Sequence, residues 1–224
     1  LVYYCGPGKY LNFSNPWNAK SKNLGGSEEA VINISQRFEK LGWNVKVYCV
    51  TPNNQTFHIK GVTYTPYWEW LPLNPTDITV LWRDPSLLDI ENINSKKIIL
   101  DLHDTIDSRW LTPKRINNTH FIFVKSKFHK SILNNKSHKI VIIPNGINTL
   151  PIHNNNKNKN MIVCTSSPDR CIHALLRALP IIRKQIPDAE IHWAYGFKSG
   201  IAKGGMEADE RPWVKDWVEK MKTL

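Results

Sequence analysis

The chain has 224 residues, and its 30 Lys and Arg against 19 Asp and Glu give a net charge of +11. With 41% hydrophobic and 22% charged residues it can bury a core, which excludes wholesale disorder and a long coiled coil. No apolar run approaches the ~20 residues that a membrane-spanning helix needs. The composition therefore predicts a globular protein of one or two domains, at ~150 residues per domain.

The amino-terminal residues do not have the basic, apolar, small-residue order of a signal peptide. We therefore expect a cytoplasmic protein, with peripheral contact with an anionic membrane left open. The four cysteines contain no C-x-x-C pair and lie mostly in apolar runs, which predicts buried, reduced thiols and no metal site. They are Cys5, Cys49, Cys164 and Cys171.

The first predicted element is a strand over residues 1–5, which stops at a glycine. A long loop follows and closes at Gly25 and Gly26, after which apolar residues recur at helical spacing as far as Gly42. Ser27 is the expected N-cap of this helix. A second strand over residues 45–50 completes a β-α-β unit, whose two strands must be parallel. The glycine loop then lies at the carboxyl ends of the strands, where such sheets bind ligands.

The same alternation continues to about residue 145. Strands are expected at residues 78–82, 97–102, 121–124 and 140–143, with a helix at 127–133. The sequence thus predicts an α/β fold, with a doubly wound, Rossmann-like amino-terminal domain over residues 1–145.

Residues 146–160 contain a polar, Asn-rich tract with little to bury, which predicts an interdomain linker. Residues 161–224 begin a second pattern of the same kind. It consists of a strand at 161–164, a helix at 172–182 kinked by Pro180, a strand at 190–195 and a helix at 212–221. We expect these residues to form the first part of a second Rossmann-like domain.

Three segments are candidates for chemistry. Gly25 and Gly26 let backbone amides approach a phosphate or carboxylate at a helix N-terminus, although a flexible loop with an ordinary cap is the alternative. His103 lies between Asp101 and Asp104 at a strand end, where an acid can fix its tautomer and the ring can donate a hydrogen bond to a substrate hydroxyl. A solvated histidine is the alternative.

The third segment is the turn Ser166-Ser167-Pro168-Asp169-Arg170. Arg170 lies near a helix N-terminus, where the dipole disfavours a cation, so we interpret it as a phosphate ligand assisted by Ser166 and Ser167. An ion pair with Asp169 is the alternative.

Two further features have weaker interpretations. The aromatic residues around Glu69 and Arg83 could stack on a sugar ring, or they could be core. The Lys-rich stretch at 125–136 is interpreted mainly as the solvated face of a helix, with an anionic surface as the alternative. No phosphate loop of the Gly-x-x-x-x-Gly-Lys type, serine-hydrolase elbow or His-Glu-x-x-His motif is present.

Several of these segments, in this order, resemble glycosyltransferase family 4, whose members have the two-domain GT-B architecture. The resemblance runs through Gly25-Gly26-Ser27-Glu28-Glu29-Ala30-Val31, Asp101-Leu102-His103-Asp104, Phe123-Val124-Lys125-Ser126-Lys127-Phe128-His129, Ile143-Pro144-Asn145-Gly146-Ile147, Ser166-Ser167-Pro168-Asp169-Arg170 and Pro187-Asp188-Ala189-Glu190-Ile191 up to Tyr195-Gly196.

The resemblance implies a role for each candidate residue. His103 would be the catalytic residue, which hydrogen-bonds the transferred sugar. The donor-binding residues would be Gly25, Gly26, Ser166, Ser167, Arg170 and Gly196. The acceptor-side residues would be Glu28, Asp104 and Arg83. The glycine that usually follows the family arginine is Cys171 here.

The resemblance also implies a retaining transfer from a nucleotide-diphosphate sugar to a glycan, lipid or protein-linked acceptor, without cofactor or metal. The absence of a DxD triplet agrees with a metal-independent enzyme. The family's Glu-x7-Glu motif is also absent, which implies a chain truncated within the second domain. The alternative is a noncatalytic α/β module that binds a polyanion or a nucleotide sugar, although we do not expect nucleic acid as the partner.

Overall fold

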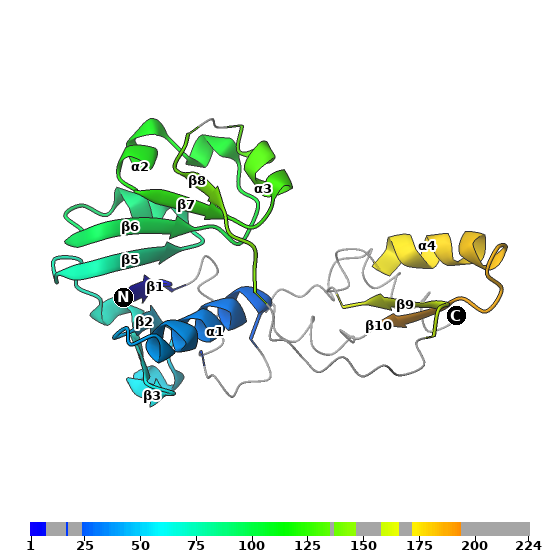
Figure 1. Ribbon diagram of the computed structural model, residues 1–224, viewed down its shortest axis with the longest axis horizontal. Coiled ribbons are helices and arrows are strands. Elements are labelled where there is room, and N and C mark those ends of the chain that lie inside the picture. The colour runs from blue at the N-terminus through cyan, green and yellow to red at the C-terminus, as the bar shows by residue number, and fades with distance from the viewer. Residues whose placement is uncertain (8–16, 18–23, 135–136, 147–157, 166–171, 194–224) are drawn as a thin grey trace. The chain divides into compact units, whose positions relative to one another are not determined.

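The computed structural model describes residues 1–7, 17, 24–134, 137–146, 158–165 and 172–193. The chain divides into two compact units, Leu1–Asn148 and Thr149–Leu224 (Figure 1). The described strands form an eight-stranded sheet in the first unit and a two-stranded sheet in the second.

The elements of the first unit alternate between strands and helices. Its strands are β1 (Val2–Tyr4), β2 (Lys46–Cys49), β3 (Phe57–Ile59), β4 (Val62–Pro66), β5 (Thr76–Trp82), β6 (Ser95–Asp101), β7 (Phe121–Val124) and β8 (Ile140–Ile142). Its α-helices are α1 (Gly26–Lys40), α2 (Pro113–Asn117) and α3 (Lys127–Ile132). Short 3-10 helices are η1 (Pro52–Asn54), η2 (Tyr67–Glu69), η3 (Pro85–Asp89) and η4 (Ser108–Trp110).

The strand order in this sheet is β3-β4-β2-β1-β5-β6-β7-β8, and among the described pairs β3 with β4 alone is antiparallel. The chain runs outward from β1 through β2 to β4, returns to the other side of β1 at β5, and then runs outward to β8. This reversal beside β1 defines a doubly wound sheet. The predicted Rossmann-like fold is therefore confirmed for the first unit.

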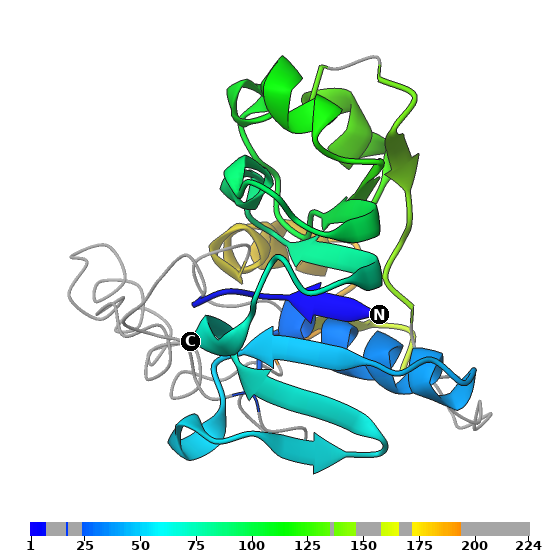
Figure 2. The same cartoon turned by 90° about the vertical axis from the view of Figure 1, so that its left-hand side faces the viewer.

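Two layers of side chains enclose the sheet, because successive residues of a strand point to opposite faces. On one face α1 runs alongside β1 and β2 (Figure 2). The buried core on that face includes Tyr3, Val31, Val47, Val62, Tyr64 and Val80. The opposite core includes Leu81, Leu88, Leu100, Leu111, Ile122 and Leu133. Leu88 belongs to η3 and Leu133 is the C-cap of α3, so these two helices lie on the face away from α1.

One predicted helix boundary is confirmed, and a β-hairpin and a short helix were missed. The helix predicted to end at Gly42 does so, with Gly42 in the left-handed region at φ +88°. The hairpin β3–β4 and the helix α2 were not predicted. The hairpin turns at Lys60 and Gly61, which both have positive φ, and its register is fixed by the pairing of β4 with β2.

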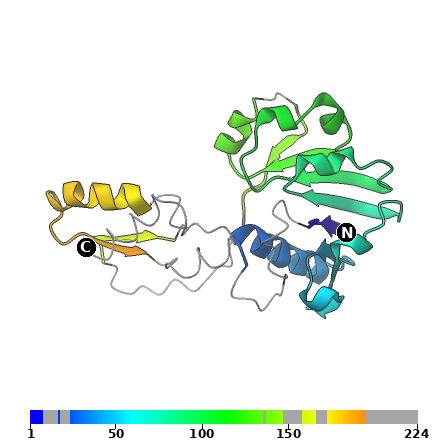
Figure 3. The same ribbon diagram turned by 180° about the vertical axis from the view of Figure 1, so that it is seen from behind.

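The second unit contains a β-α-β unit made of β9 (Met161–Cys164), α4 (Ile172–Arg183) and β10 (Glu190–Trp193). β9 and β10 are parallel, and α4 packs beside them (Figure 3). The helix continues past Pro180 to Arg183. The strand–helix–strand order predicted for this part of the chain is thus confirmed, whereas the helix predicted at 212–221 lies outside the described residues.

The described cysteines agree with the prediction of reduced thiols. Cys5, Cys49 and Cys164 are buried and form no disulfide, and burial raises the pKa of the Cys5 and Cys49 thiols well above the ordinary value. Cys171 lies outside the described residues. None of the helices in the described ranges combines the length and the apolar composition needed to cross a bilayer.

Candidate functional site

The sheet of the first unit places several of the predicted site residues along one edge. Arg83 directly follows β5, His103 follows β6 and Lys125 follows β7, so all three lie at the carboxyl ends of parallel strands. α1 begins at the same edge, since it follows β1 in the chain. The strand order reverses between β1 and β5, and ligands of doubly wound sheets bind beside such a reversal.

The helix α1 begins two residues earlier than an N-cap at Ser27 would place it. Its N-cap is Gly25, which makes no side-chain cap, so the prediction of Ser27 as N-cap is wrong. Ser27 instead donates a hydrogen bond from Oγ to Glu28 Oε2 at 2.9 Å. This contact holds an acid near the positive end of the helix dipole, which is electrostatically favourable.

The two glycines of this loop have different surroundings. A Cβ added at Gly25 would lie 2.5 Å from Glu28 Oε2, whereas one added at Gly26 would meet nothing within 4 Å. Glu28 therefore covers Gly25, and an anion approaching the helix N-terminus would reach the open space beside Gly26 first.

Arg83 joins the acceptor-side residues that the resemblance implied. Its Nε donates to Asp104 Oδ2 at 2.7 Å, and Nη2 forms an ion pair with the same carboxylate. Its Nη1 lies 3.7 Å from Glu28 Oε1. The guanidinium also stacks 4.9 Å above the Trp82 ring. Glu28, Arg83 and Asp104 thus form one cluster, built from α1 and from the segments after β5 and β6.

The backbone of Arg83 adopts a conformation that is unusual for a residue with a side chain. Its φ of +66° is in the left-handed region, which costs a residue with a Cβ about 1–2 kcal/mol. Its N–H donates to the carbonyl of Asp101 at 2.9 Å, which fixes this conformation beside β6.

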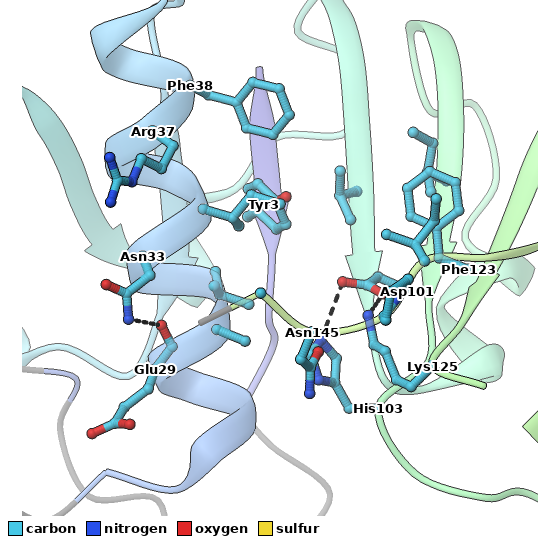
Figure 4. Close-up of a pocket in the computed structure, with 18 of the residues that line it drawn as sticks. Tyr3, Glu29, Asn33, Arg37, Phe38, Asp101, His103, Phe123, Lys125 and Asn145 are labelled. Carbon is cyan, nitrogen blue, oxygen red and sulfur yellow. Dashed lines mark hydrogen bonds and ion pairs between the residues drawn. The ribbon is translucent and has the colours of Figure 1, made fainter. Parts of the chain in front are cut away.

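His103 is held by a buried acid. Its Nε2 donates to Asp101 Oδ2 at 3.2 Å, and Asp101 Oδ1 accepts from Lys125 Nζ at 2.5 Å (Figure 4). The exposed fractions of these side chains are 4% for His103, 12% for Asp101 and 17% for Lys125. The three groups therefore form a network that is largely shielded from solvent.

Burial of Asp101 works to raise its pKa, but the hydrogen bond from His103 and the charge of Lys125 together hold it below the ordinary value. The carboxylate is therefore ionised at neutral pH, and it accepts a hydrogen bond from the N–H at Nε2 of His103. In the neutral ring this leaves Nδ1 as a hydrogen-bond acceptor. Such a ring would accept a hydrogen bond from a substrate hydroxyl, whereas the predicted donation to a hydroxyl would use a protonated Nδ1.

Lys125 and His129 were missed as site residues, because the stretch 125–136 was interpreted as a solvated helix face. The Lys125 N–H donates to His129 Nδ1 at 3.3 Å, and Ser126 caps α3 by accepting from the His129 N–H at 3.0 Å. His129 is buried, and burial together with the nearby Lys125 lowers its pKa. The neutral imidazole therefore helps to position Lys125. The sequence signal was that Lys125 directly follows an apolar strand.

A cavity of about 530 Å³ adjoins this network on the α1 face of the sheet. Asp101, His103, Lys125 and Asn145 line it together with apolar side chains of α1 and of the strands (Figure 4). Its size falls in the range of small-molecule sites.

The remaining predicted site residues are Ser166, Ser167, Arg170 and Gly196, and all four lie outside the described residues. Within the described ranges, no group of three or more His, Cys, Asp or Glu residues is arranged to hold a metal ion.

The comparisons with known proteins give a partial structural match. No family model matches the sequence, and no curated protein matches it. Among solved structures, the crystal structure of TarM resembles this chain with a TM-score of 0.37 and 16% sequence identity. The match covers 59% of this chain and 30% of the TarM chain, so this chain spans less than a third of TarM. The strand order of the described sheet is what defines the first unit as a Rossmann-like α/β domain.

Proposed function

We propose that the protein works as a retaining, metal-independent glycosyltransferase of the GT-B type, which moves a sugar from a nucleotide-diphosphate sugar to an acceptor. The pairing of His103 with the buried carboxylate of Asp101, at the edge where the strand order reverses, is the observation that carries this proposal. The motifs that resemble family 4 agree with it, since His103 is also the residue to which they assign the transferred sugar.

The residues of the site suit a reaction driven by electrostatics. When a glycosidic bond to a diphosphate breaks, positive charge develops on the sugar ring and negative charge on the leaving group. His103, with its proton on Nε2, would accept a hydrogen bond at Nδ1 from a sugar hydroxyl and fix the ring in place. The Asp101 carboxylate behind it keeps the imidazole in that tautomer.

The leaving diphosphate would meet hydrogen-bond donors from two sources. The amide of Gly26 lies at the start of α1, where the helix dipole favours an anion. Ser166, Ser167, Arg170 and Gly196 remain the predicted contacts on the second unit. The cluster of Glu28, Arg83 and Asp104 would bind hydroxyl groups of the acceptor.

The alternative is a noncatalytic module that binds a polyanion or a nucleotide sugar, and the net charge of +11 is the observation that favours it. Salt dependence separates the two. Counterion release makes the affinity for a polyanion fall steeply with salt, whereas a nucleotide sugar held by a few hydrogen bonds should bind with weak salt dependence.

The test is calorimetric titration with UDP, GDP and ADP sugars and with a nucleic-acid oligomer, each at 50 and 200 mM salt (roughly the interval over which polyanion affinity changes most visibly). The transferase predicts saturable binding of one nucleotide sugar at both salt concentrations. It also predicts that His103→Ala lowers turnover more than donor affinity, and that Arg170→Ala weakens diphosphate binding. Binding of the oligomer alone, lost at the higher salt, would favour the polyanion module.

We further propose a cytoplasmic location with peripheral contact with an anionic membrane. The basic charge supports such contact, because anionic headgroups attract Lys and Arg near the surface. Co-sedimentation with vesicles of neutral and of anionic lipid tests it.

A further inference from the structure

The cavity beside His103 has a polar end and an apolar body. Asp101 and His103 lie at the carboxyl end of β6, and Lys125 lies at the carboxyl end of β7. Toward the amino ends of the strands most of the lining is apolar, although Glu29, Asn33 and Arg37 of α1 also line the cavity. The apolar lining includes Val31, Ile34 and Phe38 of α1 and Val80, Ile99 and Phe123 of the sheet.

The cavity is also elongated along α1. Both Gly26 at the start of the helix and Phe38 near its end line the cavity. Twelve residues of α-helix rise about 18 Å. Because α1 begins at the carboxyl edge of the sheet, the His103 end and the Phe38 end lie at opposite ends of this length.

Among the residues that the structure describes, the apolar wall of the cavity is incompletely covered. The buried residues of η3, and those that pack around α2 and α3, belong to the core on the opposite face. On the α1 face, Ile78, Ile99 and Phe123 of β5, β6 and β7 are only half-buried, and Ile34 of α1 is 40% exposed. Parallel strands are normally covered by apolar groups on both faces. These side chains therefore favour an apolar ligand over water.

The burial of His103 sets how a substrate can meet it. The side chain is 4% exposed, and its ring borders this cavity. A substrate group that contacts the imidazole must therefore occupy the polar end of the cavity, and any extension of that substrate along α1 enters the apolar body.

We propose that the cavity binds an amphiphilic acceptor, with its hydroxyl-bearing headgroup at His103 and its hydrocarbon chain between α1 and strands β5 to β7. This inference rests on the proposed glycosyl transfer and selects a lipid-like acceptor from the classes that the sequence left open. The cluster of Glu28, Arg83 and Asp104 lies outside the cavity lining. In this proposal it contacts the headgroup from the solvent side.

The test is calorimetric titration of the 224-residue chain with hexyl, octyl and decyl glucoside below their micelle concentrations. Burial of each added methylene predicts an affinity increase of about fourfold until the apolar body is filled. Glucose without an alkyl chain should bind far more weakly than any of the three.

Two variants and a matched control locate the binding site. Ala30→Trp places a large side chain in the cavity from α1, and Ile34→Asp adds a charge at its half-exposed wall with little loss of packing. Each should reduce octyl glucoside affinity at least tenfold. Lys40→Trp, at an exposed position of the same helix that does not line the cavity, should leave it unchanged. Ile34→Asp keeps the test valid if Ala30→Trp fails to fold.

Affinity that is independent of chain length, or that both cavity variants leave unchanged, would overturn the proposal. So would a dimer in sedimentation that Ile34→Asp dissociates, because a second copy of the chain would then occupy the apolar face. Nucleotide-sugar binding without alkyl glucoside binding would overturn this inference alone. Alkyl glucoside binding in the cavity without donor binding or turnover would instead overturn the proposed glycosyl transfer.

Discussion

Asp101 accepts a hydrogen bond from His103 Nε2 at 3.2 Å while its other carboxylate oxygen accepts from Lys125 Nζ. One buried carboxylate thus links the ends of two neighbouring strands and determines which nitrogen of His103 carries the proton. The strongest predictions follow from this relationship.

Asp101→Asn should change the His103 tautomer, because an amide can donate to the ring as well as accept from it. We expect turnover to fall about 10-fold or more, with donor affinity nearly unchanged. ¹⁵N NMR of the imidazole nitrogens should report loss of the Nε2-protonated form.

The same substitution leaves the amine of Lys125 without its anion, which by itself destabilises the fold. Asp101→Asn combined with Lys125→Met should recover part of the stability without restoring turnover. If the double variant regains full activity, the acid acts only on folding and not through His103.

His129 makes the fold sensitive to acid. Its pKa is lowered from 6.5 by burial, so the unfolded chain takes up a proton at a higher pH than the folded chain does. The free energy of unfolding should therefore be largest above about pH 6.5 and should decline as the pH falls below it. His129→Asn, which keeps an acceptor near the position of Nδ1, should flatten this decline in urea unfolding at pH 7 and pH 5.

The pKa of His120 is also lowered, so His120 contributes to the pH dependence of stability. Because both proteins contain His120, this contribution cancels when wild type and His129→Asn are compared. An identical pH dependence in wild type and His129→Asn would assign the acid sensitivity to other groups.

Arg83 lies in a left-handed conformation at φ +66°, so its two small replacements should differ. Arg83→Gly and Arg83→Ala both remove the contacts to Asp104 and Glu28. Glycine adopts positive φ without the steric penalty of a Cβ, so Arg83→Gly should be more stable than Arg83→Ala by about 1 kcal/mol. Urea denaturation of the pair measures this difference, and a more stable alanine variant would contradict the conformation.

Leu100 is fully buried at the centre of the core opposite α1. Leu100→Ala should lower the free energy of unfolding by about 2–5 kcal/mol, through lost burial and the cavity left behind. Leu73, which is 68% exposed, provides the matched control, and Leu73→Ala should have little effect. Equal losses in the two variants would mean that this core is wrongly placed.

The sequence by itself determined the doubly wound pattern and the edge that carries the site. Runs such as Phe121 to Val124 identify buried parallel strands, and the residue after each such run must lie at the carboxyl edge. This local reasoning was enough to select Gly26 and His103, whereas Arg83 was selected from its aromatic neighbours and the family resemblance, and Lys125 was missed. It failed for the β3–β4 hairpin, whose register depends on pairing with β2, a strand already occupied on its other side by β1.

The tertiary structure alone decided which side chains meet. Lys125 and Asp101 are separated by 24 positions, and only the parallel pairing of β6 with β7 brings their side chains together. The same applies to Arg83, whose partners Glu28 and Asp104 come from α1 and from the segment after β6. Periodicity reports which face of an element is apolar, because that depends on neighbouring residues. The partner across a sheet depends on strand order, which no local pattern encodes.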